Sequence, residues 1–419
     1  MNPNPAIMRS VEQLGYRVTV GDVATQIGLN IAEVNQGLLA LAADAGGHLQ
    51  VAESGDVVYQ FPQNFRDILR NKYLQIRIKE WWKKIWSVLF YLIRISFGIF
   101  LILSILLITA TIIIIMTASS DRDNDNRSSN SRGFNFFFFP DLFWYFSPDY
   151  NYNRQERRRE KGENDEMNFL EAVFSFLFGD GDPNDNLEER RWAEIGSVIS
   201  NNQGAVVAEQ IAPYLDDIGE KYQQEYEDYM LPVLVRFNGF PKVSSEGQIV
   251  YYFPELQVKA SKKQGRSVSE YLHEFAWRFS AASSGQIMLS AGLGGVNLVG
   301  ALILGNLLTK NAAVAQIGGL VAFTQGIYGL LLAYGIGFLA IPLIRYFWIN
   351  WRNDQINNRN HQRQERARLL AGADTSLQKK LAFALEFAAE KVIGQEDAVY
   401  STETDLLEQE FQNKLIDKG

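Results

Sequence analysis

The chain contains no cysteine among its 419 residues. This absence excludes thiol catalysis, disulfides, thiolate metal sites and cysteine-ligated iron–sulfur clusters. Histidine is nearly as scarce, because only His48, His273 and His361 occur, in three separate segments. No phosphate-binding P-loop, nucleophile elbow or paired-histidine zinc motif is present either. We therefore expect a protein that is not an enzyme and that holds no cofactor and no metal.

Two acidic clusters are the remaining candidates for a cation. One is Asp180–Asp185 and the other is the pair Asp216-Asp217. The first has a loop-like spacing but lacks the distal bidentate glutamate of a calcium loop. A solvated turn is the preferred interpretation.

Charge is absent from three long apolar stretches. The first, Ile95–Ala118, would reach ~36 Å as a helix, which exceeds the ~30 Å of a bilayer core. The second and third, Gln286–Thr309 and Gly318–Ile344, are separated by a short polar tract and read as a helical hairpin. A pair of buried helices in a soluble domain is the alternative, but uncharged lengths above about 20 residues favour three transmembrane helices.

The hairpin differs from the first span in its glycine content. Small residues let helices approach closely in lipid, and the glycines predicted to do so are Gly295, Gly300, Gly305, Gly326 and Gly329. The first span, rich in isoleucine and leucine, is expected to face lipid. A small-molecule transporter or channel component remains an alternative, although the polar candidates within the hairpin are uncharged: Asn297, Asn306, Thr324, Gln325, Tyr328 and Tyr334.

Two separated segments share one pattern. A turn glycine, Gly55 or Gly247, leads into a short alternating strand that ends in Phe-Pro. In the first copy, helices are expected at 6–14, 20–27 and 31–45, a short strand at 17–19 and a hairpin at 48–61. In the second, helices are expected near 192–199, 206–214 and 221–237. This order predicts an internal duplication of a winged-helix module.

Winged helices often bind DNA, and the net charge of each module distinguishes DNA binding from protein binding. Residues 1–62 hold two basic and six acidic side chains, a net charge of −4, and residues 187–256 hold five and twelve, a net charge of −7. DNA affinity comes largely from neutralised phosphates. A membrane-tethered transcription regulator is therefore an alternative only, nucleic acid is an unlikely partner, and protein binding is the better use of these modules.

Membrane-interface residues are expected on both sides of the first span. Before it, basic residues alternate with tryptophans, at Trp81, Trp82, Lys83, Lys84 and Trp86, a pattern typical of the cytoplasmic headgroup region. After it, an aromatic run too short to cross, with Phe136, Phe137, Phe138, Phe139 and Trp144, is expected to lie at the interface or against a partner. A short apolar piece at 167–179 is expected to lie on the surface. These features predict membrane lipid as a partner and a cytoplasmic amino-terminal module.

The fold class is thus a multi-domain α+β membrane protein. Its predicted parts are a first module at 1–65, an interfacial helix and first span at 66–118, a polar linker with aromatic segments at 119–186, a second module at 187–260, an amphipathic connector at 261–285, the hairpin at 286–349 and a soluble carboxyl-terminal region at 350–419. In the last part we expect a charged helix to Leu370, an amphipathic helix at 377–393 and an acidic segment at 396–410.

Positive charge leaves the topology open. It favours a cytoplasmic side before the first span and also after the last one, where Arg345, Arg352, Arg359, Arg363, Arg366 and Arg368 gather. Three crossings cannot satisfy both preferences. Either the region of the first span and the aromatic run re-enters as a hairpin, or the charge rule fails here.

The carboxyl stretch Ala389-Glu390-Lys391-Val392-Ile393-Gly394-Gln395-Glu396-Asp397-Ala398-Val399-Tyr400-Ser401-Thr402-Glu403-Thr404-Asp405, with the two Phe-Pro strands around a membrane segment, resembles a family of cyanobacterial and chloroplast membrane proteins. Its plant members are loosely labelled iron–sulfur cluster biosynthesis proteins, a label that follows an appended cysteine-containing domain absent here. The resemblance implies a thylakoid or bacterial plasma membrane and carries over no active residue. The function expected is a scaffold that binds proteins, in assembly or maintenance of a photosynthetic membrane complex, with complex subunits or a second copy as partners.

Overall fold

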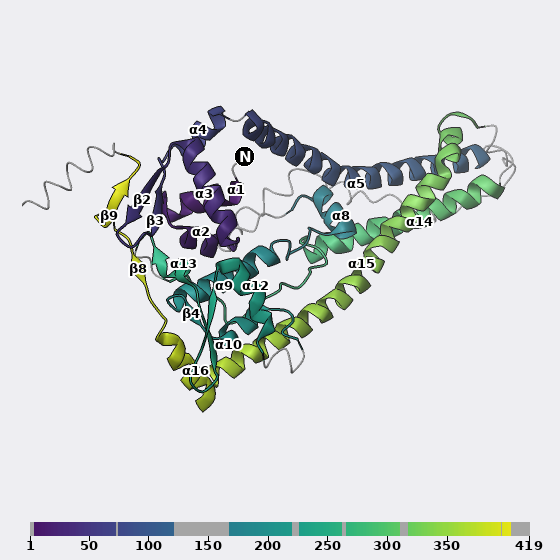
Figure 1. Cartoon of the computed structure of the whole chain (residues 1–419). Coiled ribbons are helices and arrows are strands. Elements are labelled where there is room, and N and C mark those ends of the chain that lie inside the picture. Colours follow the sequence, from purple (N-terminus) through teal and green to yellow (C-terminus); the bar gives the residue numbers. More distant parts are fainter. Residues whose placement is uncertain are drawn as a thin grey trace, which may run out of the picture. The chain divides into compact units, whose positions relative to one another are not determined.

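The computed structural model describes residues 4–72, 74–120, 167–219, 226–261, 265–310, 317–394 and 396–403. It is mostly helical with a few small sheets (Figure 1). The chain divides into two compact units. Unit 1 comprises Met1–Trp82, Pro183–Ala276 and Asn353–Gly419, and unit 2 comprises Lys83–Asp182 and Trp277–Arg352. The predicted aromatic residues Phe136–Phe139 and Trp144 lie outside the described residues.

The amino-terminal part of unit 1 has the elements that the sequence predicts. They are α1 (Pro5–Leu14), β1 (Arg17–Val18), α2 (Val20–Ile27), α3 (Ile31–Ala45), β2 (His48–Ala52) and β3 (Val57–Gln60). Local chemistry fixes the ends of the helices. Thr19 and Asp22 form a reciprocal capping box at the start of α2, and left-handed Gly28 and Gly46 end α2 and α3. Helix α4 (Phe65–Lys72) follows.

The second set of elements is more irregular than predicted. It comprises α9 (Leu187–Asn201), β4 (Ala205–Val206), α10 (Ala208–Ile211), η2 (Ala212–Tyr214), η3 (Asp228–Met230), α12 (Leu231–Phe237), β5 (Phe240–Val243), β6 (Ile249–Tyr252), α13 (Pro254–Gln257) and β7 (Val258–Lys259). The helix expected at 206–214 begins as a strand. The helix expected at 221–237 is, in its described part, a 3-10 turn followed by α12, whose second residue is Pro232. Residues 265–283 contain neither helix nor strand.

The two small sheets have the same strand order and the same register. In the first, β3 lies between β1 and β2, and in the second, β6 lies between β4 and β5. Tyr59 of β3 pairs with Leu49 and Val18, and Tyr251 of β6 pairs with Pro241 and Val206. Matching hairpin sequences therefore form matching pairings.

The two sets of elements share one hydrophobic core. It joins Val23, Val34 and Leu38 of the first set to Ile199, Phe237 and other residues of the second. Helix α2 lies directly on α9, since a Cβ placed on Gly28 would meet Trp192 Cβ at 2.5 Å. A side-chain hydrogen bond adds to this interface, because the Asp22 carboxylate accepts from Ala260 N at 2.9 Å. The two sets are therefore one folded body.

The carboxyl-terminal segment corrects two expectations. Helix α16 (Thr375–Leu385) ends earlier than the predicted 377–393 helix, and the acidic segment contains a strand. Strand β8 (Lys391–Val392) pairs in parallel with β7, and β9 (Ala398–Ser401) pairs antiparallel with β2. Arg17 donates to the carbonyls of Ile393, at 2.7 Å, and Gly394, at 2.9 Å. The chain end thus binds both sets of elements in unit 1.

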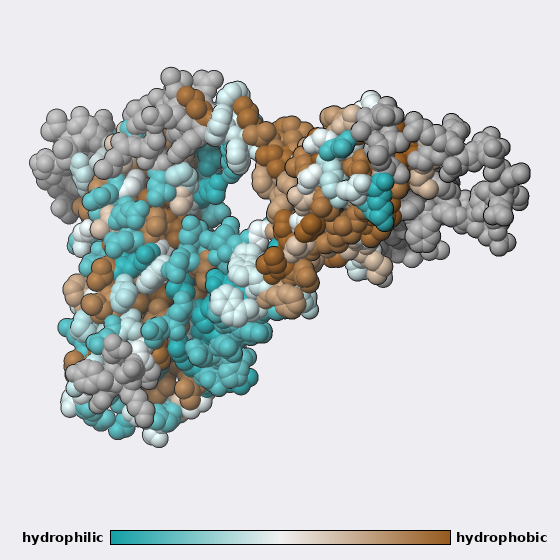
Figure 2. All heavy atoms as spheres, turned by 90° about the vertical axis from the view of Figure 1, so that its right-hand side faces the viewer, coloured by the Kyte–Doolittle hydropathy of each residue, from teal (hydrophilic) through white to brown (hydrophobic). Residues whose placement is uncertain are grey.

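Unit 2 contains the apolar helices. Three helices are long and apolar enough to cross a membrane: α5 (Leu74–Ser120), α14 (Ser284–Lys310) and α15 (Gly319–Ala371). In Figure 2 a mainly apolar surface, interrupted by a few hydrophilic patches, contrasts with a largely hydrophilic one. This confirms the three predicted membrane-spanning candidates.

Helix α5 does not face lipid on all sides, contrary to expectation. One stripe is buried at a spacing of three and four residues, formed by Leu101, Ser104, Ile108, Thr111 and Ile115. This spacing is that of a helix packed in a bundle. The composition of α5 concealed the stripe because isoleucine and leucine suit both lipid and a helix interface.

The short apolar piece at 167–179 also differs from its prediction. It forms α8 (Phe169–Phe178), and Val173, Phe176 and Leu177 are buried against Leu101, Leu293 and Phe338 of the long helices. It is therefore part of the bundle and not a helix lying on a surface. Arg345 holds its carboxyl end by donating to Phe176 O at 3.0 Å.

Candidate functional site

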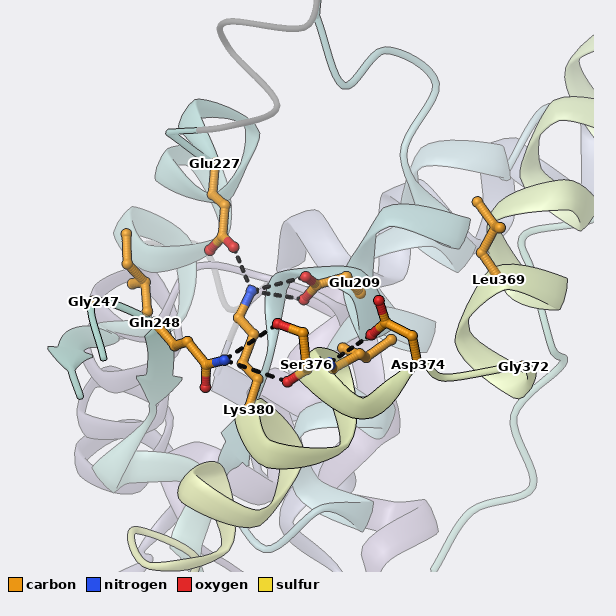
Figure 3. Close-up of a pocket in the computed structure, with 11 residues that line it drawn as sticks. Glu209, Glu227, Gly247, Gln248, Leu369, Gly372, Asp374, Ser376 and Lys380 are labelled. Atoms are coloured by element: carbon orange, nitrogen blue, oxygen red, sulfur yellow. Dashed lines mark hydrogen bonds and ion pairs between the residues drawn. The ribbon is translucent and has the colours of Figure 1, made fainter. Parts of the chain in front are cut away.

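Unit 1 contains a polar pocket of about 500 Å³ (Figure 3). Its walls come from α10, η3, the turn between β5 and β6, and the start of α16. The lining residues are Glu209, Glu227, Gly247, Gln248, Ile249, Leu369, Gly372, Asp374, Ser376, Leu377 and Lys380. The pocket is therefore formed by two segments that are 120 residues apart in sequence at their nearest lining residues, Ile249 and Leu369.

Lys380 is the central group of this pocket. Its side chain is almost fully buried, and its ammonium donates to both oxygens of Glu209, at 2.8 and 2.9 Å, and to Glu227. Glu227 also accepts a hydrogen bond from the Tyr251 hydroxyl at 2.8 Å. Glu227 has a φ of 54°, which is left-handed backbone for a residue other than glycine. The surrounding bonds hold it in that conformation.

Hydrogen bonds and ion pairs join the polar groups in and beside this pocket. Burial, and then the nearby Glu227 carboxylate, raises the pKa of Tyr251 far above its usual value, so its hydroxyl stays protonated. Gln248 donates to Ser376 O at 3.3 Å, and Asp374 accepts from Leu377 N at 2.8 Å. Because these groups bind one another, their contacts hold α16 against the second set of elements.

A second cluster fastens the end of α15 within unit 1. Arg363 is 1% exposed and binds Glu274 Oε1 at 2.8 Å and Asp216. Arg359 binds the same Glu274 through two hydrogen bonds, at 2.7 and 2.6 Å, and Arg191 binds Asp216. Bidentate guanidinium–carboxylate pairs of this kind are among the strongest ionic contacts in proteins.

The carboxylates of this cluster remain charged. Burial alone would raise the pKa of Glu274, but the hydrogen bonds from Arg359 and the charge of Arg363 outweigh it, and the net shift is downward. The pKa of Asp216 is likewise lowered, because Arg363 and Arg191 more than offset its burial. The stability that these pairs provide is present above the ordinary carboxyl pKa and is lost as the pH falls below it.

The acidic clusters are accounted for by protein partners. Asp216, a candidate cation ligand, binds Arg191 and Arg363. Asp180, the first residue of the other cluster, binds Arg94 at 2.6 Å and accepts from Ala281 N at 2.8 Å. Within the described residues, no group of three potential metal ligands occurs.

The predicted interface residues before the first span lie at the start of α5. Trp81, Trp82 and Trp86 are more than half exposed, and Lys83 and Lys84 are exposed as well. None of them contributes to a described core. This exposure is what a headgroup region would require, since each ring and charge is available to lipid.

The five predicted packing glycines divide into two groups. A Cβ on Gly300 would lie 3.1 Å from Ile108, and one on Gly305 would overlap the Tyr328 hydroxyl, so these two permit close helix contacts. Gly295, Gly326 and Gly329 have no such neighbour among the described residues. Two other glycines of the hairpin also permit close contacts, because Gly294 faces Phe338 and Gly335 faces Leu298; glycine content alone does not show which helix face is used.

Polar side chains of the spans join helices. Ser104 donates to Asn297 at 2.7 Å, Thr111 and Thr324 lie 3.0 Å apart, and Tyr334 donates to Phe97 O. Such contacts are typical of helix association in lipid. Three of the predicted polar candidates, Asn297, Thr324 and Tyr334, thus take part in contacts between helices.

Comparison with known proteins gives one informative result. No known family description matches the chain, and no solved structure matches it. The chain is similar to an uncharacterized chloroplastic protein of Arabidopsis thaliana, At5g03900, with 42% identity over 427 residues. The match covers 98% of this chain and 81% of the plant protein, whose description names no activity, ligand or partner.

Proposed function

We propose, from the premise that the chain belongs to the same family as this chloroplastic plant protein, that it is a membrane-anchored platform that binds other proteins. Its two winged-helix modules, copied from one ancestor, act as a single body. It serves the assembly or maintenance of a membrane complex, in a thylakoid or bacterial plasma membrane.

One observation carries this proposal. Three soluble segments that the spans separate in sequence, 4–72, 183–276 and 353–403, pack into one unit. The first two share the main core, and the last adds Ile393 beside Val58 and Ala384 beside Val250. Residues that share a core lie on the same side of a membrane. We infer that the whole of unit 1 lies in one compartment, which favours a returning chain over a failure of the charge rule.

The contacts inside unit 2 support the same topology. Helix α8 lies beside the first part of α5, since Arg94 binds Asp180 and Phe97 lies 4.9 Å from Phe178 between ring centroids. The far end of α5 packs instead on α14 and α15, around Ile115. Ser120, the last residue of α5, lies ~35 Å from Phe97 along the helix axis, whereas α8, the next described helix, lies beside Phe97. This placement supports the proposal that the chain on both sides of this region lies in one compartment.

Basic side chains favour the cytoplasmic or stromal side for unit 1. Lys83 and Lys84 lie at the start of α5, and Arg345 and Arg352 lie at the corresponding end of α15. Both positions flank the same end of the bundle, so one orientation satisfies the positive-inside rule at both. Arg359, Arg363 and Arg366 are weaker evidence for the orientation, because they bind groups within unit 1.

Surface composition supports protein rather than DNA as the partner. The described face of α3 has no lysine or arginine, and phosphate contacts would need them. Helix α12 instead exposes Leu231 and Val235, one turn apart and each about two thirds exposed. This pair offers apolar surface that a protein partner could cover and that a nucleic-acid backbone would not use.

Affinity purification in gentle detergent tests the proposal. The tagged protein, taken from its own membranes, is expected to bring stoichiometric subunits of one membrane complex. The double variant Leu231→Ser/Val235→Ser is expected to lower their recovery at least about tenfold, since two exposed apolar anchors are lost. The matched control is Leu385→Ser, an exposed leucine at the end of α16. Recovery of a lone homo-oligomer from the native protein would contradict the proposal.

A further inference from the structure

The two matching sheets of unit 1 differ in one respect. The outer edge of β2 is covered by β9, whereas β5, the corresponding strand of the second sheet, pairs only with β6 among the described residues. The coverage shows in burial, because all four residues of β5 are exposed and the residues of β2 are half-buried or buried. One sheet thus has an occupied edge and the other an open one.

The hydrogen-bond pattern of the hairpin shows which backbone N–H and C=O groups of β5 point away from β6. Ser244 N donates to Gln248 O at 2.8 Å, so this pair closes the hairpin through hydrogen bonds. Antiparallel pairs alternate between bonded and non-bonded. Lys242 therefore bonds to β6, while the backbone groups of Pro241 and Val243 point outward. The same alternation in β2 places the backbone N–H and C=O groups of Leu49 and Val51 on the outer edge of the strand.

The edge of β2 that is covered by β9 confirms this alternation and shows what kind of segment such an edge accepts. Leu49 O accepts from Thr402 N at 3.0 Å, and Leu49 N donates to the Thr402 hydroxyl at 2.9 Å. Val51 pairs with Tyr400 in the antiparallel register. An extended segment of four or five residues is therefore what this edge accepts.

Pro241 occupies the place of Leu49 and lacks an N–H. Proline and lysine on a short edge strand commonly protect it from unwanted pairing. Here the missing N–H corresponds to the Leu49 N–H, which binds only a side-chain hydroxyl in the covered sheet. The carbonyl of Pro241 and both groups of Val243 remain available. Phe240 and Val243 are 44% and 64% exposed, so apolar surface flanks these groups.

We propose that the outer edge of β5 receives an extended segment of a partner protein, which lies antiparallel to β5 as β9 lies on β2. This inference rests on the proposed platform function and specifies its partner. Backbone bonds to Pro241 O and Val243 supply affinity, and apolar side chains of the partner pack on Phe240 and Val243.

Amide hydrogen exchange tests this pairing. The probe is the Val243 amide, compared between the complex purified in gentle detergent and the same protein stripped of partners. Exchange at Val243 is expected to slow at least about 100-fold in the complex, because the N–H becomes hydrogen-bonded. The Val51 amide, already on a paired strand, is the internal reference and is expected to change little.

A matched pair of variants separates the possible outcomes. Val243→Pro removes the outward N–H, as Pro241 already does, and is expected to lower partner recovery about tenfold, whereas Val243→Thr keeps the N–H and the recovery. Unchanged exchange and recovery with partners still present would overturn the β5 pairing and leave the platform intact. A loss of self-association alone would show that a second copy fills the edge. The absence of any partner would overturn both proposals.

Discussion

Replacement of Arg363 by alanine is expected to lower the free energy of unfolding of unit 1 by about 3–5 kcal/mol. The guanidinium is 1% exposed, and its removal leaves Asp216 and Glu274 with fewer partners in a buried site. Among the described residues, Glu274 then keeps only Arg359 and the partly exposed Asp216 keeps only Arg191, so the large effect comes from the loss of a fully buried guanidinium and its charge-assisted hydrogen bonds. Arg363→Lys is expected to lose part of this energy, because an ammonium cannot reproduce the fork that binds both carboxylates.

Hydrogen exchange of the slowest amides of α9 and β6 measures this change within unit 1, independently of the spans. The matched control is Arg368→Ala in the same helix, where an exposed arginine is removed. The control is expected to change the free energy by less than about 0.5 kcal/mol. Equal effects of the two substitutions would show that the cluster does not fasten α15 to unit 1.

The second large effect is expected at Gly21, in the contact between α2 and α13. A Cβ at this position would lie 2.0 Å from Glu255 O, and backbone atoms cannot yield as a flexible side chain does. Gly21→Ala is therefore expected to separate the two sets of elements and to lower the free energy of unfolding of unit 1 by about 3 kcal/mol.

Thermal unfolding of the full chain in detergent, followed by hydrogen exchange in α2 and α9, measures this effect. Gly372→Ala is the matched control, since its nearest neighbour is Arg368 O at an ordinary 3.5 Å. If Gly21→Ala were as stable as Gly372→Ala, the close contact between the two sets of elements would be wrong.

Local signals in the sequence were enough to predict the amino-terminal elements and the spans. The capping box at Thr19 and the glycines Gly28 and Gly46 fix helix ends by chemistry within a few residues. The three spans follow from length and the absence of charge. Such features depend only on residues that are close to them in sequence, so they can be recognised without knowledge of the tertiary structure.

Features that depend on distant partners were not predictable. In the sequence, Arg363 is one of six arginines that bear on membrane topology, and its partner Glu274 lies 89 residues earlier. Strand β9 lies in an acidic stretch and forms because β2 offers an edge some 350 residues away. Lys380 is likewise defined by Glu209 and Glu227, which belong to another segment. No pattern within each segment identifies these pairings.

Single-cysteine labelling tests the central claim most directly, because the native chain has no cysteine and each variant carries one thiol. Cysteines replace exposed residues in the three soluble segments, Ser54, Ser245 and Gln378, and Lys310 at the opposite end of the bundle. In closed vesicles of uniform orientation, a membrane-impermeant maleimide is expected to label the first three from one side and Lys310→Cys only from the other. Labelling of Ser54→Cys and Ser245→Cys from opposite sides would contradict a single platform.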